Sequence, residues 1–261
     1  MKVEVLLSCM NQADYSILDK TNISTDAVIV NQCDIDNVVE FDYKGSKVIW
    51  CNSTQRGISR SRNLALQYAS HDICLLVDDD EILVEGYERI ITNSFETVKQ
   101  ADLIFFNLHP SNPKQKWYVN TEQKELSFYN IMRYGAPRAA FRREKIVGKI
   151  QFNESFGPGT KFYSGEDSLF FVDVLKKGLK AYTSPEYLAN IEDGDSTWFT
   201  GYTEQYFITK GAVFTQMSKK YSLPLILQYI LRYSKHTTNI GFFKAYSAML
   251  EGRRAVMQGK I

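Results

Sequence analysis

An apolar run that ends in four carboxylates constrains this chain more than any other feature. Residues 73–77 are Ile-Cys-Leu-Leu-Val, and residues 78–81 are Asp-Asp-Asp-Glu. A short apolar run between polar segments predicts a strand covered on both faces, as in a parallel sheet. The carboxylates follow at the carboxyl end of this strand, which is where ligands bind in open α/β sheets.

The acidic loop predicts a metal site. Adjacent carboxylates repel one another, and a divalent cation would neutralise them. Carboxylate oxygens are hard ligands that suit Mg²⁺ or Mn²⁺, so we expect Asp80, with Asp78 beside it, to hold such an ion. The alternative is an acidic surface loop that follows a core strand and caps the next helix.

The remaining hydrophobic pattern predicts a doubly wound α/β fold. Strands are expected at 3–9, 27–31, 47–51, 73–77, 101–108 and near 139–141, and helices at 60–69, 85–100 and 164–177. A short strand or loop is expected at 181–185. From Tyr202 onward the pattern predicts helices, broken near Pro224 and Gly241.

Composition excludes some classes of protein. The formal net charge is +1 over 261 residues, which gives no argument for a nucleic-acid partner. No apolar run reaches the roughly 18 residues of a membrane span, and residues 1–7 are too short and too interrupted an apolar run for us to expect a secretory signal there. The four cysteines show no metal-ligand spacing, which favours reduced thiols in a cytoplasmic protein. We expect one compact catalytic domain at 1–215 and a helical extension at 216–261.

Three motifs follow one another in an order that resembles the family 2 glycosyltransferases of the GT-A fold. They are Gly-Ile-Ser-Arg-Ser-Arg-Asn at 57–63, Asp-Asp-Asp at 78–80 and Gly-Glu-Asp at 165–167. The first is similar to the family's Gly-x-Ser-x-Ala-Arg-Asn stretch, with Ser61 where Ala is usual. The second resembles its Asp-x-Asp metal motif, and the third its Glu-Asp motif at the head of a helix. The later run at 196–202 is similar to bacterial polysaccharide members.

The resemblance implies a Rossmann-like, mostly parallel sheet flanked by helices, and an inverting hexosyltransferase. The implied donor is a nucleotide-diphosphate sugar, above all a UDP-sugar, bound by residues 1–108. Residues 109–215 would then bind the acceptor, a hydroxyl of a glycan or lipid-linked glycan in polysaccharide or glycolipid biosynthesis.

Two acidic residues fit the catalytic role that the resemblance implies. Asp167 would take the proton of the acceptor hydroxyl, because a carboxylate near the positive end of a helix stays ionised. Glu166 would hold the acceptor or orient Asp167. The alternative is ordinary acidic charge at a helix start, with Ser164 as the cap.

Five residues are candidates for binding the donor: Ser8, Asp34, Arg62, Asp78 and Asp79. Ser8 could instead fill space, and Arg62 could be a solvated charge on a helix. Asp34 follows the second strand, where the family has an acidic residue that contacts the base, although Asn-Gln-Cys-Asp replaces the usual Asp-Asp-Gly-Ser. We interpret Asn63 as structural, with hydrogen bonds to backbone at the helix start.

The third metal ligand and the aromatic residues near the expected acceptor site are less well defined by the sequence. Many relatives add a histidine to the metal shell; here Asp193, Asp195 or water would have to complete it. Trp198, Phe199 and Tyr202 could face a sugar ring or pack in the core. Trp117 and Tyr118 lie in a loop-rich region that suits an acceptor.

The segment 223–233 is apolar with basic residues around it. It predicts a helix that lies on an anionic membrane, at the inner face of the plasma membrane, or one that packs on the domain or in a homodimer.

Two rival functions stay open at this stage. A sugar-nucleotide nucleotidyltransferase would need a glycine-rich phosphate loop after the first strand, and residues 8–12 contain no glycine. A non-catalytic nucleotide-sugar-binding module could share the scaffold.

Overall fold

The computed structural model describes residues 1–110, 118–192, 201–232 and 240–260. The chain divides into two compact units, one of residues 1–152 and 170–194, the other of residues 153–169 and 195–261. These units do not coincide with the expected domains, 1–215 and 216–261, which stay a prediction. No helix in the described ranges has both the length and the apolar character needed to cross a membrane.

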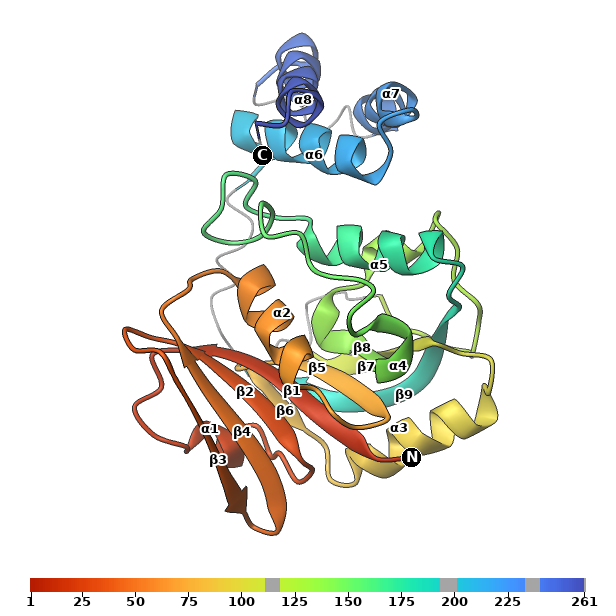
Figure 1. Cartoon of the computed structure of the whole chain (residues 1–261). Helices are drawn as coiled ribbons and strands as arrows, with labels where there is room; N and C mark the ends of the chain where they lie inside the picture. Colours follow the sequence, from red (N-terminus) through yellow and green to blue (C-terminus); the bar gives the residue numbers. More distant parts are fainter. Residues whose placement is uncertain (111–117, 193–200, 233–239, 261) are drawn as a thin grey trace. The chain divides into compact units, whose positions relative to one another are not determined.

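A nine-stranded mixed sheet forms the first unit, in the order β3-β4-β2-β1-β5-β8-β7-β9-β6 (Figure 1). Its strands are β1 (Val3–Met10), β2 (Ala27–Gln32), β3 (Asn37–Tyr43), β4 (Ser46–Ser53), β5 (Ile73–Asp78), β6 (Glu81–Leu83), β7 (Leu103–His109), β8 (Ala139–Arg142) and β9 (Ala181–Ile191). Its helical segments are α1 (Ile17–Lys20), α2 (Ile58–Tyr68), α3 (Tyr87–Thr97), α4 (Arg143–Ile146) and the short 3₁₀ turns η1 (Ile131–Arg133) and η2 (Ala136–Arg138). Helix α5 (Glu166–Lys176) begins within the second unit and ends within the first.

The parallel part of the sheet, β4-β2-β1-β5, confirms the strands expected from the apolar runs. Every residue of β2 is buried, because helices cover both faces. Alternate side chains of β1, β2 and β5 join one core with α1 and α3, and α2 packs on β1 and β2 (Figure 1). The register places Ser8 opposite Asp78, so the carboxyl ends of these strands meet at one edge.

Three strands differ from the sequence-based expectation, one of them being β6, a strand of three residues that was not expected. Strand β3 was not expected; it pairs antiparallel with β4 at the sheet edge, and most of its residues are exposed, so no apolar run marks it. Strand β9 extends from 181 to 191 rather than 185, because it pairs along its length with β7 and then with β6.

Three helices dominate the second unit: α6 (Glu204–Met217), α7 (Ser222–Arg232) and α8 (Phe242–Met257). The expected break near Gly241 is confirmed. The expected break near Pro224 is confirmed as well: the chain leaves the helix at 218–221, and Pro224 lies in the first turn of α7, where proline is tolerated.

Glycines allow α6 and α8 to approach backbone to backbone. A Cβ atom on Gly211 would lie 2.0 Å from the carbonyl oxygen of Met249, and one on Gly252 would lie 1.9 Å from that of Ile208. Real Cβ atoms do not come so close to a backbone oxygen, so each helix needs glycine at its crossing point.

Candidate functional site

The acidic loop lies at the carboxyl edge of the parallel strands, as predicted. Strand β5 ends at Asp78, Asp79 and Asp80 form a turn, and β6 begins at Glu81. Burial raises the pKa of both Asp79 and Asp80, and the negative charge of Asp78 adds to the effect. The Lys20 ammonium acts in the opposite direction, and its Nζ donates to the Asp79 carbonyl over 3.1 Å. The loop therefore concentrates negative charge that one lysine opposes only in part.

Arg62 does not lie in solvent, which excludes one of its two interpretations. The side chain is 2% exposed, and its Nη2 donates to Asp78 Oδ1 over 2.9 Å, with Oδ2 at 3.3 Å. The guanidinium also lies 5.4 Å from the centre of the Phe152 ring. Helix α2 thus holds Asp78 in place, and whether Arg62 also contacts the donor stays a prediction.

Glu81 is a residue of this loop whose role the sequence did not reveal. Its side chain is buried, and Oε2 accepts a hydrogen bond of 2.9 Å from the Asp78 backbone amide. Oε1 has no hydrogen-bond partner among the described residues. Burial, followed by the charge of Asp78, raises the pKa of Glu81 well above its usual range. The Glu81 side chain therefore connects the two ends of the acidic turn. The only sign of it in the sequence is its position directly before the apolar residues 82–84.

Ser8 and Ser61 form a buried hydroxyl pair. Ser61 Oγ donates to Ser8 Oγ over 2.8 Å, and both residues are buried. Ser61 stands where the similar motif usually has alanine, and its hydroxyl is satisfied by the hydrogen bond to Ser8. Donor contact by Ser8 stays a prediction, and the pair shows that its hydroxyl also connects β1 to α2.

Two amides organise the rest of this edge, and sequence reasoning assigned neither of them a role. Gln32 Oε1 accepts from the Gly57 amide over 2.7 Å, which fixes the start of α2 to the end of β2. Gly57 has φ +117°, a conformation that L residues with a side chain rarely adopt. Asn31 exchanges hydrogen bonds with the Gln12 backbone at 2.9 Å and 3.1 Å and donates to Asn52 over 2.8 Å.

Asp34 lies in the loop after β2 and is 96% exposed on its side chain. Its Oδ1 accepts a 2.6 Å hydrogen bond from Arg56 Nη2. Asp34 thus lies near the carboxyl edge of the sheet, with its side chain in solvent.

Asn63 is structural, as interpreted, but its hydrogen-bond partner is far away in the sequence. Asn63 Nδ2 donates to the Phe152 carbonyl over 2.9 Å, and Oδ1 accepts from the Phe152 amide over 2.8 Å.

The residues present fit a hard cation that shares its shell with a ligand. Within the described ranges, no group of three or more His, Cys, Asp or Glu side chains is placed to hold a metal. Mg²⁺ sites in enzymes often use only one or two carboxylates together with phosphate oxygens and water. The Asp80 side chain reaches solvent, although the surrounding chain partly desolvates its carboxyl group and, with the charges of Asp78 and Asp79, raises its pKa; a cation would offset that repulsion. The oxygens of Asp78 lie against Arg62.

Glu166 and Asp167 form the first turn of α5, which confirms their predicted place at a helix start. The residue that caps the helix is Gly165, not Ser164: its carbonyl accepts from the Leu169 amide over 3.0 Å. Gly165 has φ +104°, and a Cβ there would lie 2.4 Å from a Val213 methyl group. Glu166 is buried, and its charge opposes the lowering of the Lys210 pKa that burial causes. Glu166 and Asp167 belong to the second unit, and the acidic loop belongs to the first.

Tyr118 is half exposed, and a buried arginine holds its backbone. Arg138 Nη1 donates to the Tyr118 carbonyl over 3.0 Å, and Nη2 donates to Asn107 Oδ1 over 2.9 Å. The Arg133 guanidinium lies over the Tyr118 ring, 4.4 Å from the ring centre.

Tyr202 packs edge-on against Tyr206, with 5.2 Å between the ring centres. The predictions for Trp117, Asp193, Asp195, Trp198 and Phe199 lie outside the described residues.

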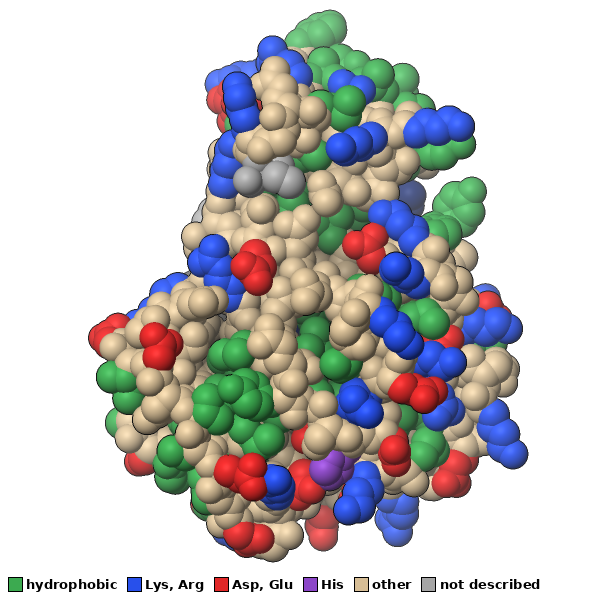
Figure 2. Space-filling view, viewed as in Figure 1, with side chains coloured by type: hydrophobic (Ala, Val, Ile, Leu, Met, Phe, Trp, Pro, Cys, Tyr) green, Lys and Arg blue, Asp and Glu red, His purple; other side chains and the backbone are tan. Residues whose placement is uncertain are grey.

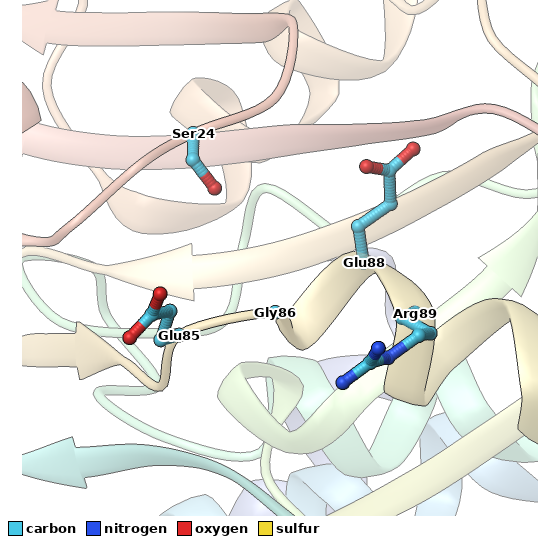
Figure 3. A pocket seen from close by; sticks show the side chains of 5 residues that line it. All are labelled: Ser24, Glu85, Gly86, Glu88 and Arg89. Carbon is cyan, nitrogen blue, oxygen red and sulfur yellow. The ribbon is translucent and has the colours of Figure 1, made fainter.

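One surface hollow lies away from these residues. It is lined by Ser24, Glu85, Gly86, Glu88 and Arg89 (Figure 3). Ser24 precedes β2 and Gly86 precedes α3, so the hollow is not at the carboxyl edge of the parallel strands. It contains none of the residues predicted from the sequence.

The parallel strands, their covering helices and the acidic turn define an α/β fold of the GT-A type, which confirms the predicted fold class. The chain is similar to S. aureus TarS 1-349 in complex with UDP-GlcNAc, at 14% identity over 99% of this chain and 92% of that chain, with a TM-score of 0.64. It is similar to a second structure of S. aureus TarS at 16% identity over 83% of this chain and 39% of that chain, with a TM-score of 0.60. No protein-family model and no curated protein sequence matches the chain.

Proposed function

We propose that this protein is an inverting, metal-assisted glycosyltransferase that uses a nucleotide-diphosphate sugar. The observation that carries the proposal is an acidic turn at the carboxyl edge of a sheet whose fold is shared with a protein bound to UDP-GlcNAc. Another structure of TarS 1-349, separate from the two compared above, is of its complex with UDP. The proposed donor is therefore a UDP-sugar, and the proposed acceptor is a hydroxyl of a glycan or lipid-linked glycan.

The first half of the chemistry is departure of the nucleoside diphosphate. A bound Mg²⁺ or Mn²⁺ would offset the negative charge that grows on the leaving phosphate oxygen. Asp80, assisted by Asp78, would hold it, and Arg62 would keep the Asp78 carboxylate from turning away. Glu81 would hold the turn closed through the Asp78 amide.

The second half is activation of the acceptor. Asp167 would take the proton from the acceptor hydroxyl, whose oxygen forms a bond to the anomeric carbon as the bond from that carbon to the diphosphate oxygen breaks. Attack opposite the leaving group inverts the anomeric configuration. A carboxylate at a helix start is favoured by the helix dipole, so Asp167 would act in its ionised form, and Glu166 would orient it or hold the acceptor.

The test combines donor binding with turnover. A screen of nucleotide sugars with and without Mn²⁺ should raise the melting temperature for the true donor, since a ligand that binds only the native state stabilises it. Incubation of that donor with candidate acceptors should release UDP and form product. Binding with neither hydrolysis nor transfer would instead favour a nucleotide-sugar-binding module.

A matched pair of variants tests the base. Asp167→Asn should keep donor binding and lose at least about 100-fold in transfer rate, within the range for a general base. The control is Asp173→Asn on the same helix, whose side chain is 48% exposed and pairs with Lys176. An Asp167→Asn protein that is as active as the control would remove Asp167 from the mechanism.

A further inference from the structure

Helix α7 has two apolar faces, and the fold uses only one of them. Ile226 and Ile230 are buried where α7 packs against α6 and α8. On the adjacent face Leu223, Leu227 and Leu231 are 45%, 49% and 60% exposed. Positions four residues apart lie on one side of a helix, so the three leucines form a continuous exposed stripe.

Such a stripe indicates an interaction surface rather than scattered exposure. Single exposed apolar residues are ordinary on protein surfaces, but contiguous patches mark sites of contact with a protein or a membrane. Tyr221, which is 57% exposed, lies one residue before the helix. Figure 2 shows hydrophobic side chains gathered on the surface of the segment that contains α7 and α8, with Lys and Arg side chains among them.

The charges that neighbour the stripe along the chain have one sign. From Gln205 through Leu250 the sequence contains no Asp or Glu, and six Lys or Arg. Lys219 and Lys220 lie just before Tyr221 and α7, and Arg232 is the last residue of α7; all three are exposed. Of the other described cations in this stretch, Lys244 pairs with Glu204 and Lys210 is partly buried beside Glu166.

This combination favours an anionic lipid surface over a second copy of the chain. Two copies meeting through the stripe would bring like charges together at both ends of α7, which disfavours association. A leaflet of anionic lipids offers negative headgroups and an apolar layer beneath them, and so complements both features of the helix. At 11 residues α7 is about 16 Å long, which suits a helix that lies in the plane of the interface.

We propose that α7 docks on an anionic membrane, with Leu223, Leu227 and Leu231 in the acyl boundary and Lys219, Lys220 and Arg232 at the level of the lipid phosphates. This proposal does not depend on the proposed transferase activity, because it rests only on the surface of the second unit.

The test is sedimentation of the full chain with lipid vesicles. Wild type should bind vesicles of phosphatidylcholine with 30% phosphatidylglycerol, and bind phosphatidylcholine alone at least 10-fold more weakly. Replacing the three leucines by serine should weaken binding to the anionic vesicles at least 10-fold. Replacing Lys219, Lys220 and Arg232 by glutamate should do the same and remove the dependence on salt.

The matched control removes exposed aromatic residues elsewhere. Phe128→Ser with Tyr129→Ser should bind as wild type does, since these residues are exposed in the first unit. All variants should keep the wild-type melting temperature within about 2 °C, because the replaced side chains are exposed. Equal binding by wild type and the leucine variant would overturn the proposal, as would equal binding to both kinds of vesicle.

A second measurement does not depend on loss of binding. Leu227→Trp should show a blue-shifted emission and quenching by brominated lipids when anionic vesicles are added, relative to the wild-type protein under the same conditions. Absence of quenching would overturn the proposal. A dimer that forms without vesicles and dissociates in the leucine variant would also overturn it, because the stripe would then be covered by a second copy.

Discussion

The guanidinium of Arg62 and the carboxylate of Asp78 form a nearly buried ion pair, with Nη2 at 2.9 Å and 3.3 Å from the two carboxylate oxygens. Arg62 comes from α2 and Asp78 from the last position of β5, so the pair connects a helix to the acidic turn. An aspartate held this way has a fixed orientation whether or not a ligand is present. The turn is therefore organised before any donor arrives.

Loss of the arginine should destabilise the protein. Arg62→Met leaves the Asp78 charge without its guanidinium, and breaking a nearly buried pair in this way costs about 3 kcal/mol in the free energy of unfolding. Urea denaturation measures it. Arg62→Met with Asp78→Asn should recover part of the loss, because no charge is then left without a partner. A single variant within about 0.5 kcal/mol of wild type would contradict the expectation.

Glu81 should tolerate glutamine better than alanine. Glutamine can still accept from the Asp78 amide, whereas alanine leaves that amide without its acceptor, which costs about 1–3 kcal/mol. Unfolding curves of Glu81→Gln and Glu81→Ala test this order. If both variants unfold at the same denaturant concentration, the hydrogen bond to the Asp78 amide does not stabilise the turn.

Asp80 should control the metal dependence of donor binding. Asp80→Asn should lower donor affinity in the presence of Mn²⁺ by at least about 10-fold, equal to about 1.4 kcal/mol, and leave affinity in EDTA unchanged. Calorimetry with the donor identified by the thermal screen measures both values. Glu144→Gln is a control for general charge loss, since Glu144 is exposed on α4 and is not a candidate for binding the donor. Equal metal dependence in wild type and Asp80→Asn would contradict the role.

The crossing of α6 and α8 should not accept a methyl group. Gly252→Ala should destabilise the protein by about 1–3 kcal/mol through overpacking against Ile208, although alanine is the better helix former by about 0.5–1 kcal/mol. The control is Ser247→Ala, an exposed position on α8, which should stay within about 0.5 kcal/mol of wild type. A stabilised Gly252→Ala protein would show that helix propensity outweighs the contact.

The four thiols should differ in reactivity. Cys9, Cys51 and Cys74 are buried, and burial raises their pKa values, that of Cys51 to about 11; Cys33 is partly exposed. Since the thiolate is the reactive form, at pH 8 a disulfide reagent should label Cys33 first and the others only at the rate of unfolding. Raising the pH towards 11 should speed the labelling of Cys51. Cys33→Ser should lose the fast phase; a fast phase that persists would contradict this order.

The elements that the sequence predicted are those with their own local signal. The apolar runs of β1, β2 and β5 are buried on both faces, so composition alone marks them. Strand β3 carries no such signal, since it is an exposed edge strand held by β4. Pro224 also carries a local signal, because proline is tolerated in the first turn of a helix and not in its interior, so it marks the break at 218–221.

The positions of candidate site residues were predictable only where the functional side chains are consecutive in the sequence. The acidic turn and the helix start at Glu166 are local, and both were placed correctly. The pair of Ser8 with Ser61 and the bond from Gln32 to Gly57 join residues far apart in the chain, and only the register of the sheet brings them together. Sequence spacing carries no information about such contacts.

The double hydrogen bond between Asn63 and Phe152 has a consequence for the order of folding. It closes a loop across 89 residues, so the start of α2 cannot reach its final state until the chain up to residue 152 is available. Strand β9, which the sheet also requires, ends only at Ile191. During synthesis the sheet therefore waits for a segment that emerges after residues 153–169 of the other unit, and contacts of such long range make folding slow.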